Sequence, residues 1–214
     1  MCVLVLTTQK GGAGKTTLAA SLAVAASRDG QRVHVIDVDP QASLYNWGRR
    51  REATDITVER CDPADFKREL TRSRHAGATI AIVDTPGFLG PAVTLALADA
   101  SLCLMPVKPS ILDIEAARPT VEQIRRIGRP FAFVLNQCVP SSQARTLDAA
   151  TALVRAGTLA PSMVAARSDF LDAMTAGQGV SEVNPKGKAA QEIAFLWQWI
   201  KSKIEVSDHG KAAA

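Results

Sequence analysis

The sequence predicts an α/β fold in which a single doubly wound, mostly parallel β-sheet is flanked by helices. Three observations predict it. Short apolar runs alternate with segments of helical pattern along the chain, as in proteins built from strand–helix–strand units. Several of the runs are continuously apolar, which is typical of parallel strands covered on both faces. The length of 214 residues suits one domain with a sizeable core.

The elements follow in order along the chain. The expected strands cover residues 2–7, 32–37, 56–60, 79–84, 101–106, 131–136 and 161–165. The expected helices cover residues 15–28, 41–51, 63–74, 91–98, 111–127, 143–156, 168–176 and 188–205. Turn residues support these boundaries, since Asp29–Gly30 and Gly128 end two helices and Pro63 suits a first helical turn. We expect one domain over residues 1–206 and a disordered tail at residues 207–214.

A glycine-rich segment lies between the first strand and the first helix. Residues 10–17, KGGAGKTT, follow the apolar run 2–6, and we call them the phosphate loop. Glycine lets a backbone pass close to a polyphosphate and tolerates positive φ, and the freed N–H groups then point at the anion together with the helix start. Lys15 would reach the β- and γ-phosphates and the Thr16 hydroxyl would ligate Mg²⁺. The residues expected to surround the nucleotide phosphates are Gly11, Gly12, Ala13, Gly14, Lys15, Thr16 and Thr17.

Acidic residues close two of the other expected strands. Asp84 ends the apolar run 79–83, where its carboxylate can hold Mg²⁺ through water while Thr16 ligates the ion directly. Asp37 ends another strand and can assist at the metal. A single Asp at a strand end commonly caps a turn, but carboxylates at the ends of two strands, after a phosphate loop, favour a metal and catalytic site.

One feature of the loop resembles a known family. Lys10 stands directly before the glycine pair, and Gln9 occupies the position where the common pattern has its first glycine. This arrangement resembles the deviant Walker A motif of the ParA/MinD ATPases, which position DNA and other cargo in bacteria. The resemblance covers about residues 2–204. Three further matches follow in the family's order: residues 37–41 for the first switch, 82–87 for the Walker B strand and second switch, and Asn136 for an adenine-facing position.

The resemblance implies a mechanism and its cofactors, ATP and Mg²⁺. Lys10 would reach across a nucleotide-sandwich dimer to the partner's phosphates, and Lys15 and Asp39 would complete the catalytic set, with Asp39 orienting the attacking water. Thr17 would contact the α-phosphate. Asn136 would pair with the adenine edge, although an Asn at a strand end is usually a turn residue.

Charge indicates the partners. The net charge is +4 and the sequence pI is about 9.0. In the ParA/MinD family, basic residues of the C-terminal third bind DNA without sequence preference in the ATP-bound dimer, although any one of them can simply belong to a solvated basic face. By this resemblance the DNA-binding residues are Arg145, Arg155, Arg167, Lys186 and Lys188.

The expected location is the cytoplasm, because the N-terminus enters the first strand at once and leaves no room for a signal peptide. The resemblance further implies association with the nucleoid when ATP is bound. The last helix carries an apolar stripe with nearby lysines, which could lie on a membrane. The polar tail that follows favours packing on the sheet instead. The stripe consists of Leu196, Trp197, Ile200 and Ile204.

The resemblance therefore implies a slow, partner-stimulated ATP hydrolase that switches between monomer and ATP-bound homodimer and drives plasmid or chromosome partition with a centromere-binding protein. The alternatives are an ATPase that positions a protein cargo through an adaptor, such as a carboxysome or chemoreceptor cluster, and a MinD-like regulator of division at the membrane. A metabolic ligase or kinase resembling dethiobiotin synthetase is a further alternative, against which Lys10 and residues 39–41 count.

Overall fold

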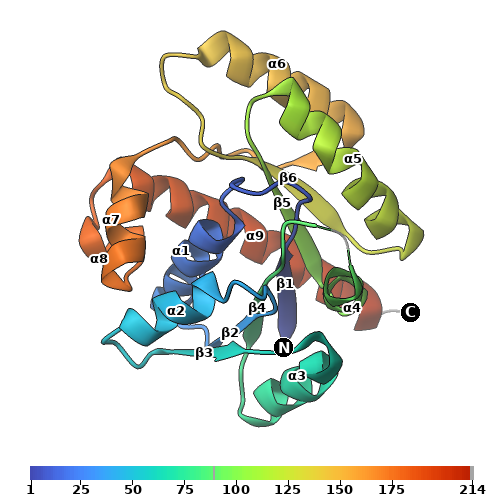
Figure 1. Ribbon diagram of the computed structural model, residues 1–214, viewed down its shortest axis with the longest axis vertical. Coiled ribbons are helices and arrows are strands. Elements are labelled where there is room, and N and C mark those ends of the chain that lie inside the picture. The colour runs from blue at the N-terminus through green and yellow to red at the C-terminus, as the bar shows by residue number, and fades with distance from the viewer. Residues whose placement is uncertain (89, 213–214) are drawn as a thin grey trace.

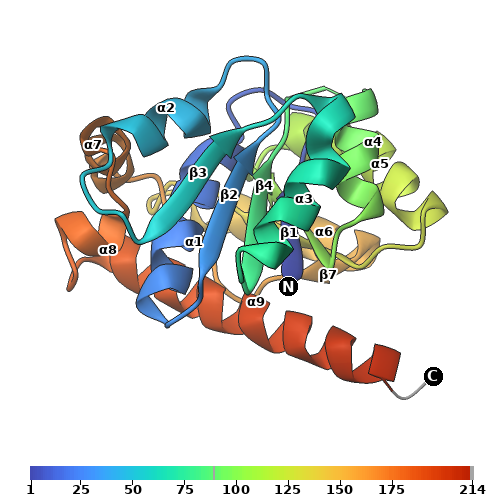
Figure 2. The ribbon, with the colours of Figure 1, turned by 90° about the horizontal axis from the view of Figure 1, so that it is seen from below.

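The computed structural model describes residues 1–88 and 90–212, with side chains described as far as Ile204. Within these residues a seven-stranded sheet forms the centre of the molecule and helices cover both of its faces (Figures 1 and 2). The strand order is β3-β2-β4-β1-β5-β6-β7, and every pair of neighbouring strands is parallel. The predicted doubly wound α/β fold is confirmed.

The elements alternate along the chain as the sequence predicts. The strands are β1 (Cys2–Leu6), β2 (Val33–Asp37), β3 (Ile56–Arg60), β4 (Ile80–Asp84), β5 (Leu102–Val107), β6 (Phe131–Leu135) and β7 (Thr158–Leu159). The helices are α1 (Lys15–Arg28), α2 (Ser43–Arg50), α3 (Phe66–His75), α4 (Pro91–Ala98), α5 (Ile111–Arg126), α6 (Gln143–Ala156), α7 (Ser168–Ala176), α8 (Val180–Val183) and α9 (Lys188–Ala212), with a 3₁₀ turn at Pro63–Asp65.

Two apolar layers hold the helices on the sheet. One lies under α1, α2, α7, α8 and α9 and contains the buried Trp47 and Trp197. The other lies under α3, α4, α5 and α6 and contains the buried Phe66 and Phe133. The neighbouring strands β1 and β4 send their following helices to opposite faces, and the carboxyl ends of such strands form the crevice where open α/β sheets bind ligands.

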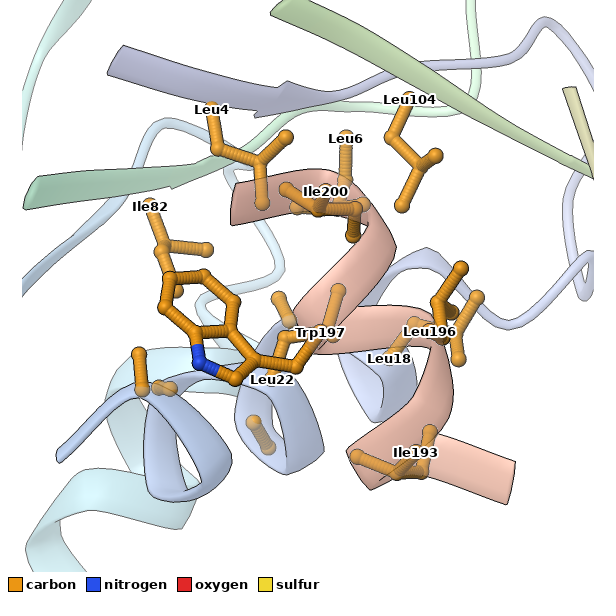
Figure 3. Close-up of a cluster of buried hydrophobic side chains, with 14 of the residues drawn as sticks. Leu4, Leu6, Leu18, Leu22, Ile82, Leu104, Ile193, Leu196, Trp197 and Ile200 are labelled. Atoms are coloured by element: carbon orange, nitrogen blue, oxygen red, sulfur yellow. The ribbon is translucent and has the colours of Figure 1, made fainter. Parts of the chain in front are cut away.

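Helix α9 packs against α1 and the sheet, as Figure 3 shows for Ile193, Leu196, Trp197 and Ile200. The predicted apolar stripe is thus buried: Leu196 and Ile200 are 0% exposed and Trp197 is 3% exposed. The Trp197 indole N–H donates to Asp29 Oδ2 at 2.9 Å. Among the described residues, no helix combines the length and apolarity that crossing a bilayer requires.

The last strand differs from the prediction. The sequence predicts a strand at 161–165, whereas β7 occupies Thr158–Leu159. Residues 161–165 form no strand; the Val164 N–H donates to the Leu135 carbonyl at 2.9 Å, and Ala165 forms an isolated bridge with Cys138. Pro161 explains the shift, because proline has no N–H to donate to a ladder.

One short helix was not predicted, and the last helix is longer than predicted. The four-residue α8 is missing from the prediction because it is too short to show periodicity; the Glu182 side chain accepts from the Gly179 N–H at its start. Helix α9 reaches Ala212, beyond the predicted limit at residue 205. The disorder of residues 207–214 stays a prediction, and the last two of these residues lie outside the described part of the chain.

Candidate nucleotide site

The parallel sheet brings the predicted site residues to one edge. The phosphate loop leaves β1, while Asp37, Asp84 and Asn136 stand at or just beyond the carboxyl ends of β2, β4 and β6. The strand register pairs Asp84 with both Asp37 and Leu6, the last residue of β1. Strand ends from distant parts of the sequence therefore lie together at the edge of the sheet where α1 begins (Figure 1).

The phosphate loop has the backbone that its glycines predict. Gly12 and Gly14 have φ values of +73° and +90°, in the left-handed region. A Cβ atom on Gly14 would collide with the amide nitrogen of Asn136. The first helical hydrogen bond runs from the Leu18 N–H to the Gly14 carbonyl at 3.0 Å. Helix α1 therefore begins directly at the end of the loop, and its first N–H groups face the space above the sheet edge.

The segment after β6 fixes the loop from the side. Asn136 is 4% exposed and its Nδ2 donates to the Ala13 carbonyl at 2.7 Å. Gln137 follows with a φ of +54°, and its Nε2 donates to the Gly12 carbonyl at 2.8 Å. In this conformation the Asn136 amide nitrogen is occupied by the loop, while the adenine-facing role of Asn136 stays a prediction. Sequence reasoning missed Gln137; its one signal was the position directly after Asn136.

Lys15 is a buried cation at the start of α1. Burial lowers the pKa of Lys15, while the carboxylates of Asp84 and Asp39 act in the opposite direction. Its Nζ lies 3.6 Å from the position that a Cβ atom on Gly87 would occupy, and that position is 3.4 Å from the Gly11 backbone nitrogen. The second switch therefore packs on the loop beside the Lys15 ammonium.

Thr16 and Asp84 form the pair of oxygen ligands expected for Mg²⁺. The Thr16 hydroxyl donates to Asp84 Oδ2 at 2.6 Å. Asp84 is 1% exposed, and burial, together with the charges of Asp37 and Asp39, raises the pKa of Asp84 to about 7 against the effects of Thr16 and Lys15. The other carboxylate oxygen, Oδ1, is buried without a hydrogen-bond partner among the described residues.

These two residues fit a magnesium ion. Hydroxyl and carboxylate oxygens are its preferred protein ligands, and Mg²⁺ commonly takes only one or two of them beside substrate phosphates and water. Within the described part of the chain, no group of three or more His, Cys, Asp or Glu side chains forms a metal cage of its own. A cation at the Asp84 carboxylate would also offset the burial cost of its charge.

The first switch separates the two remaining aspartates. Asp37 is fully buried and its oxygens accept from the N–H groups of Asp39 at 3.0 Å and Tyr45 at 2.9 Å. Burial raises the pKa of Asp37, and these hydrogen bonds oppose the rise. Here Asp37 therefore holds the turn into α2, and its role at the metal stays a prediction. Asp39 is half-buried and accepts from the Gln41 N–H at 2.9 Å.

Lys10 has a partner that the sequence did not show. Its Nζ lies 2.8 Å from Asp113 Oδ2 in the first turn of α5. The Lys10 side chain is 38% exposed and that of Asp113 is 6% exposed. Asp113 Oδ1 is buried without a hydrogen-bond partner among the described residues. The distinctive lysine is thus held inside its own subunit at the exposed edge of the loop.

A cavity of about 520 Å³ adjoins the loop on the side of α7. Its lining combines Thr17 and Asn136 with Arg167, Phe170 and Met174. Such a volume and mixed lining suit a small-molecule site, and the position next to the phosphate loop suits a nucleoside.

Comparison with known proteins shows to which family this chain belongs. The CobQ/CobB/MinD/ParA nucleotide binding domain matches residues 4–184. The chain is 30% identical over 193 residues to "Maintenance of carboxysome distribution protein A" of Halothiobacillus neapolitanus, which covers 86% of this chain and 88% of that protein. The chain belongs to the CobQ/CobB/MinD/ParA family.

Other relatives extend the likeness. Chromosome partitioning protein ParA of Caulobacter vibrioides is 30% identical over 153 residues, which cover 70% of this chain and 52% of that protein. The structure of the septum site-determining protein MinD with Mg-ADP from Pyrococcus horikoshii has a TM-score of 0.81 at 17% identity and covers 96% of this chain and 98% of that one. Apo McdA of Cyanothece has a TM-score of 0.80 at 15% identity, covering 94% of this chain and 99% of that one. The two structures share its fold.

This ParA/MinD-type chain is an ATPase, and its cofactors are ATP and Mg²⁺. The phosphate loop with Lys15 would hold the phosphates and the Thr16–Asp84 pair would hold the ion. The ion would supply charge neutralisation at the phosphates. Lys10, Lys15, Thr16, Asp39 and Asp84 come together at one edge of the sheet, as their motifs predict.

The expected DNA-binding residues of this ParA/MinD-type chain are spread over several elements. Arg145 and Arg155 lie on α6, on one face of the sheet. Lys186 lies between α8 and α9, and Lys188 is the first residue of α9, on the other face. Arg167 lines the 520 Å³ cavity and its Nη2 is 2.6 Å from Glu192 Oε1. Their contacts to DNA stay predictions.

Proposed function

We propose that this ATPase switches between a monomer and an ATP-bound nucleotide-sandwich dimer, binds DNA without sequence preference as a dimer, and drives plasmid or chromosome partition. The observation that carries the proposal is Lys10, which stands before the glycine pair with a side chain that is 38% exposed at the edge of the loop. A cation placed there can reach a phosphate outside its own subunit. Hydrolysis is slow and is stimulated by a centromere-binding or adaptor protein.

An exposed apolar surface beside the loop supports the dimer. Ile111 and Leu112 are 65% and 64% exposed and directly precede Asp113, the partner of Lys10. Phe88 is 60% exposed and follows Gly87, which packs on the loop. Large apolar side chains gathered around a charged site favour a protein interface.

The side chains have separate roles in the switch. Lys15 neutralises phosphate charge within the subunit, and Lys10 leaves Asp113 to reach the partner's phosphates. Asp39, half-buried on the first switch, orients the attacking water. On dimerisation Lys10 thus exchanges the Asp113 carboxylate for a phosphate bound to the partner subunit.

DNA binding rests on charge. The net charge of +4 and the pI of about 9.0 favour contact with polyanions. Pairing two subunits doubles the phosphate contacts of a chain, and affinity rises steeply with their number. The cations proposed for these contacts are Arg145, Arg155, Arg167, Lys186 and Lys188.

Positioning of a protein cargo through an adaptor is the second candidate. A specific observation favours it: the carboxysome distribution relative of Halothiobacillus neapolitanus aligns over 86% of this chain, whereas the Caulobacter ParA aligns over 70%. A MinD-like role at the membrane has less support, because the apolar stripe of α9 is buried against α1 and the sheet.

Light scattering after gel filtration tests the switch. We expect wild-type protein to dimerise with ATP and to remain monomeric with ADP. Lys10→Ala should bind ATP but fail to dimerise and turn over, whereas Asp39→Ala should accumulate an ATP-bound dimer that hydrolyses little. An Asp39→Ala variant that stays monomeric with ATP and retains turnover contradicts both roles.

A salt titration on two unrelated duplexes tests the DNA surface. With ATP, both duplexes should bind about equally, with a log–log salt slope of about −0.9 for each phosphate neutralised. Arg167→Glu should weaken binding to both duplexes alike. Tight binding to anionic vesicles but not to DNA would instead favour the membrane role.

A further inference from the structure

Lys108 stands beside the phosphate loop although no motif includes it. It directly follows β5, whose last residue, Val107, accepts from the Asn136 N–H at 2.9 Å. The Lys108 Nζ lies 3.8 Å from the position that a Cβ atom on Gly12 would occupy. The Lys108 side chain, just after β5, thus places a third ammonium group beside the loop, in addition to those of Lys10 and Lys15.

The three lysines differ in their partners. Lys10 forms an ion pair with Asp113, and Lys15 faces the charges of Asp84 and Asp39. Lys108 is a half-buried residue, and among the described side chains none forms an ion pair or hydrogen bond with its ammonium. An ammonium group beside a loop of anion-binding N–H groups, with no carboxylate to balance it, is a ready partner for an anion.

We propose that Lys108 is a further phosphate-contacting residue, which places its charge on the terminal phosphate of ATP. This inference rests on the nucleotide site described above. Lys15 and Thr16 stand at the start of α1, where Lys15 would reach the β- and γ-phosphates and Thr16 the ion. Gly12 lies three residues earlier in the loop that leads around the phosphates to this helix. A cation beside Gly12 therefore lies toward the outer, terminal end of a bound polyphosphate. With Lys10 held by Asp113, Lys108 supplies charge for this end within the same subunit.

Calorimetry on the full chain tests the proposal, with ATP, ADP and tripolyphosphate as probes in the presence of magnesium. Lys108→Gln should weaken ATP and tripolyphosphate binding about tenfold, as expected for the loss of one charge-assisted contact. ADP, which lacks the terminal phosphate, should bind nearly as well as it binds wild-type protein. Lys108→Arg, which keeps the charge, should retain most of the ATP affinity.

The control is Lys67→Gln, the same change of charge on the exposed surface of α3. It should leave the affinity for all three probes unchanged. Lys108→Met is a second neutral variant, and the thermal melting of each ligand-free variant checks that it is folded. Unchanged ATP affinity in the folded neutral variants, or equal losses for ATP and ADP, would overturn the proposal. Failure of the nucleotide site itself would show differently, as a wild-type protein that does not bind ATP.

Discussion

Replacing Asp84 by Asn should stabilise the ligand-free protein at pH 8. Burial raises the pKa of this carboxyl to about 7, from an ordinary value of 3.8. Between these two pH values the folded state binds the proton more tightly than the unfolded state does. The ionisation of Asp84 therefore costs stability as the pH rises from about 4 to about 7, and the cost stays at its full value above pH 7.

The magnitude follows from the pKa. At about 1.36 kcal/mol per pH unit, a change from 3.8 to about 7 corresponds to about 4 kcal/mol of lost stability above pH 7. Asn removes this cost but buries an amide N–H where Asp84 Oδ1 has no partner, which costs about 1–3 kcal/mol. The variant should therefore be more stable than wild type by about 1–3 kcal/mol at pH 8. This advantage should vanish near pH 5, where the wild-type carboxyl is largely protonated.

Urea unfolding followed by far-UV circular dichroism, without magnesium or nucleotide, measures both values. Asp29→Asn is the matched control, because hydrogen bonds from Lys201 and Trp197 lower the pKa of Asp29. The ionised Asp29 carboxylate therefore stabilises the folded protein above the pKa of an unfolded Asp, and this stability is lost as the pH falls through the lower folded pKa. Asp29→Asn should accordingly be less stable than wild type at pH 8. The reasoning would be refuted if the Asp84→Asn variant were no more stable than wild type at pH 8, or if its advantage over wild type were as large at pH 5 as at pH 8. Mg-ATP should reverse the order at pH 8 by stabilising wild type alone.

Three further predictions concern the loop and the core. Lys15→Ala should abolish ATP binding in calorimetry with magnesium, because the loop N–H groups only partly offset phosphate charge; near-normal affinity would contradict the phosphate-loop assignment. Asp113→Asn should release Lys10 and increase the ATP-dependent dimer in light scattering, and an unchanged dimer fraction would show that the ion pair does not compete. Trp197→Ala should lower the free energy of urea unfolding by about 3–5 kcal/mol, since Trp197 is 3% exposed in the core under α9; a loss below about 1 kcal/mol would contradict the packing of that helix.

The sequence predicted most of the fold because its signals are local. Five of the first six strands are short, mostly apolar runs, whereas β3 alternates apolar and polar residues in its first four positions, and each of the six lies within a residue of its expected limits. The phosphate loop was recognisable because its glycines and its lysines are adjacent in the chain. Once the sheet is parallel, the carboxyl ends of its strands meet at one edge, so Asp37, Asp84 and Asn136 had to lie near that loop.

The unpredicted features depend on distant residues or on exact backbone angles. The pair between Lys10 and Asp113 joins positions 103 residues apart, and no local pattern marks Asp113 as its partner. Gln137 reaches the loop from a left-handed conformation that is uncommon outside glycine. The last strand was misplaced because residues 161–165 are mostly apolar, although Pro161 cannot join the ladder.

The positions of the cations constrain how a DNA surface could form. Arg145 and Arg155 lie on the α6 side of the sheet, while Lys186 and Lys188 lie on the side of α7 to α9. Neither pair supplies all of the proposed phosphate contacts by itself. Arg167 also has its charge balanced by Glu192 at 2.6 Å. In a dimer each of these side chains occurs twice, so the event that we propose to release Lys10 from Asp113 would also double the cations available for contact with DNA.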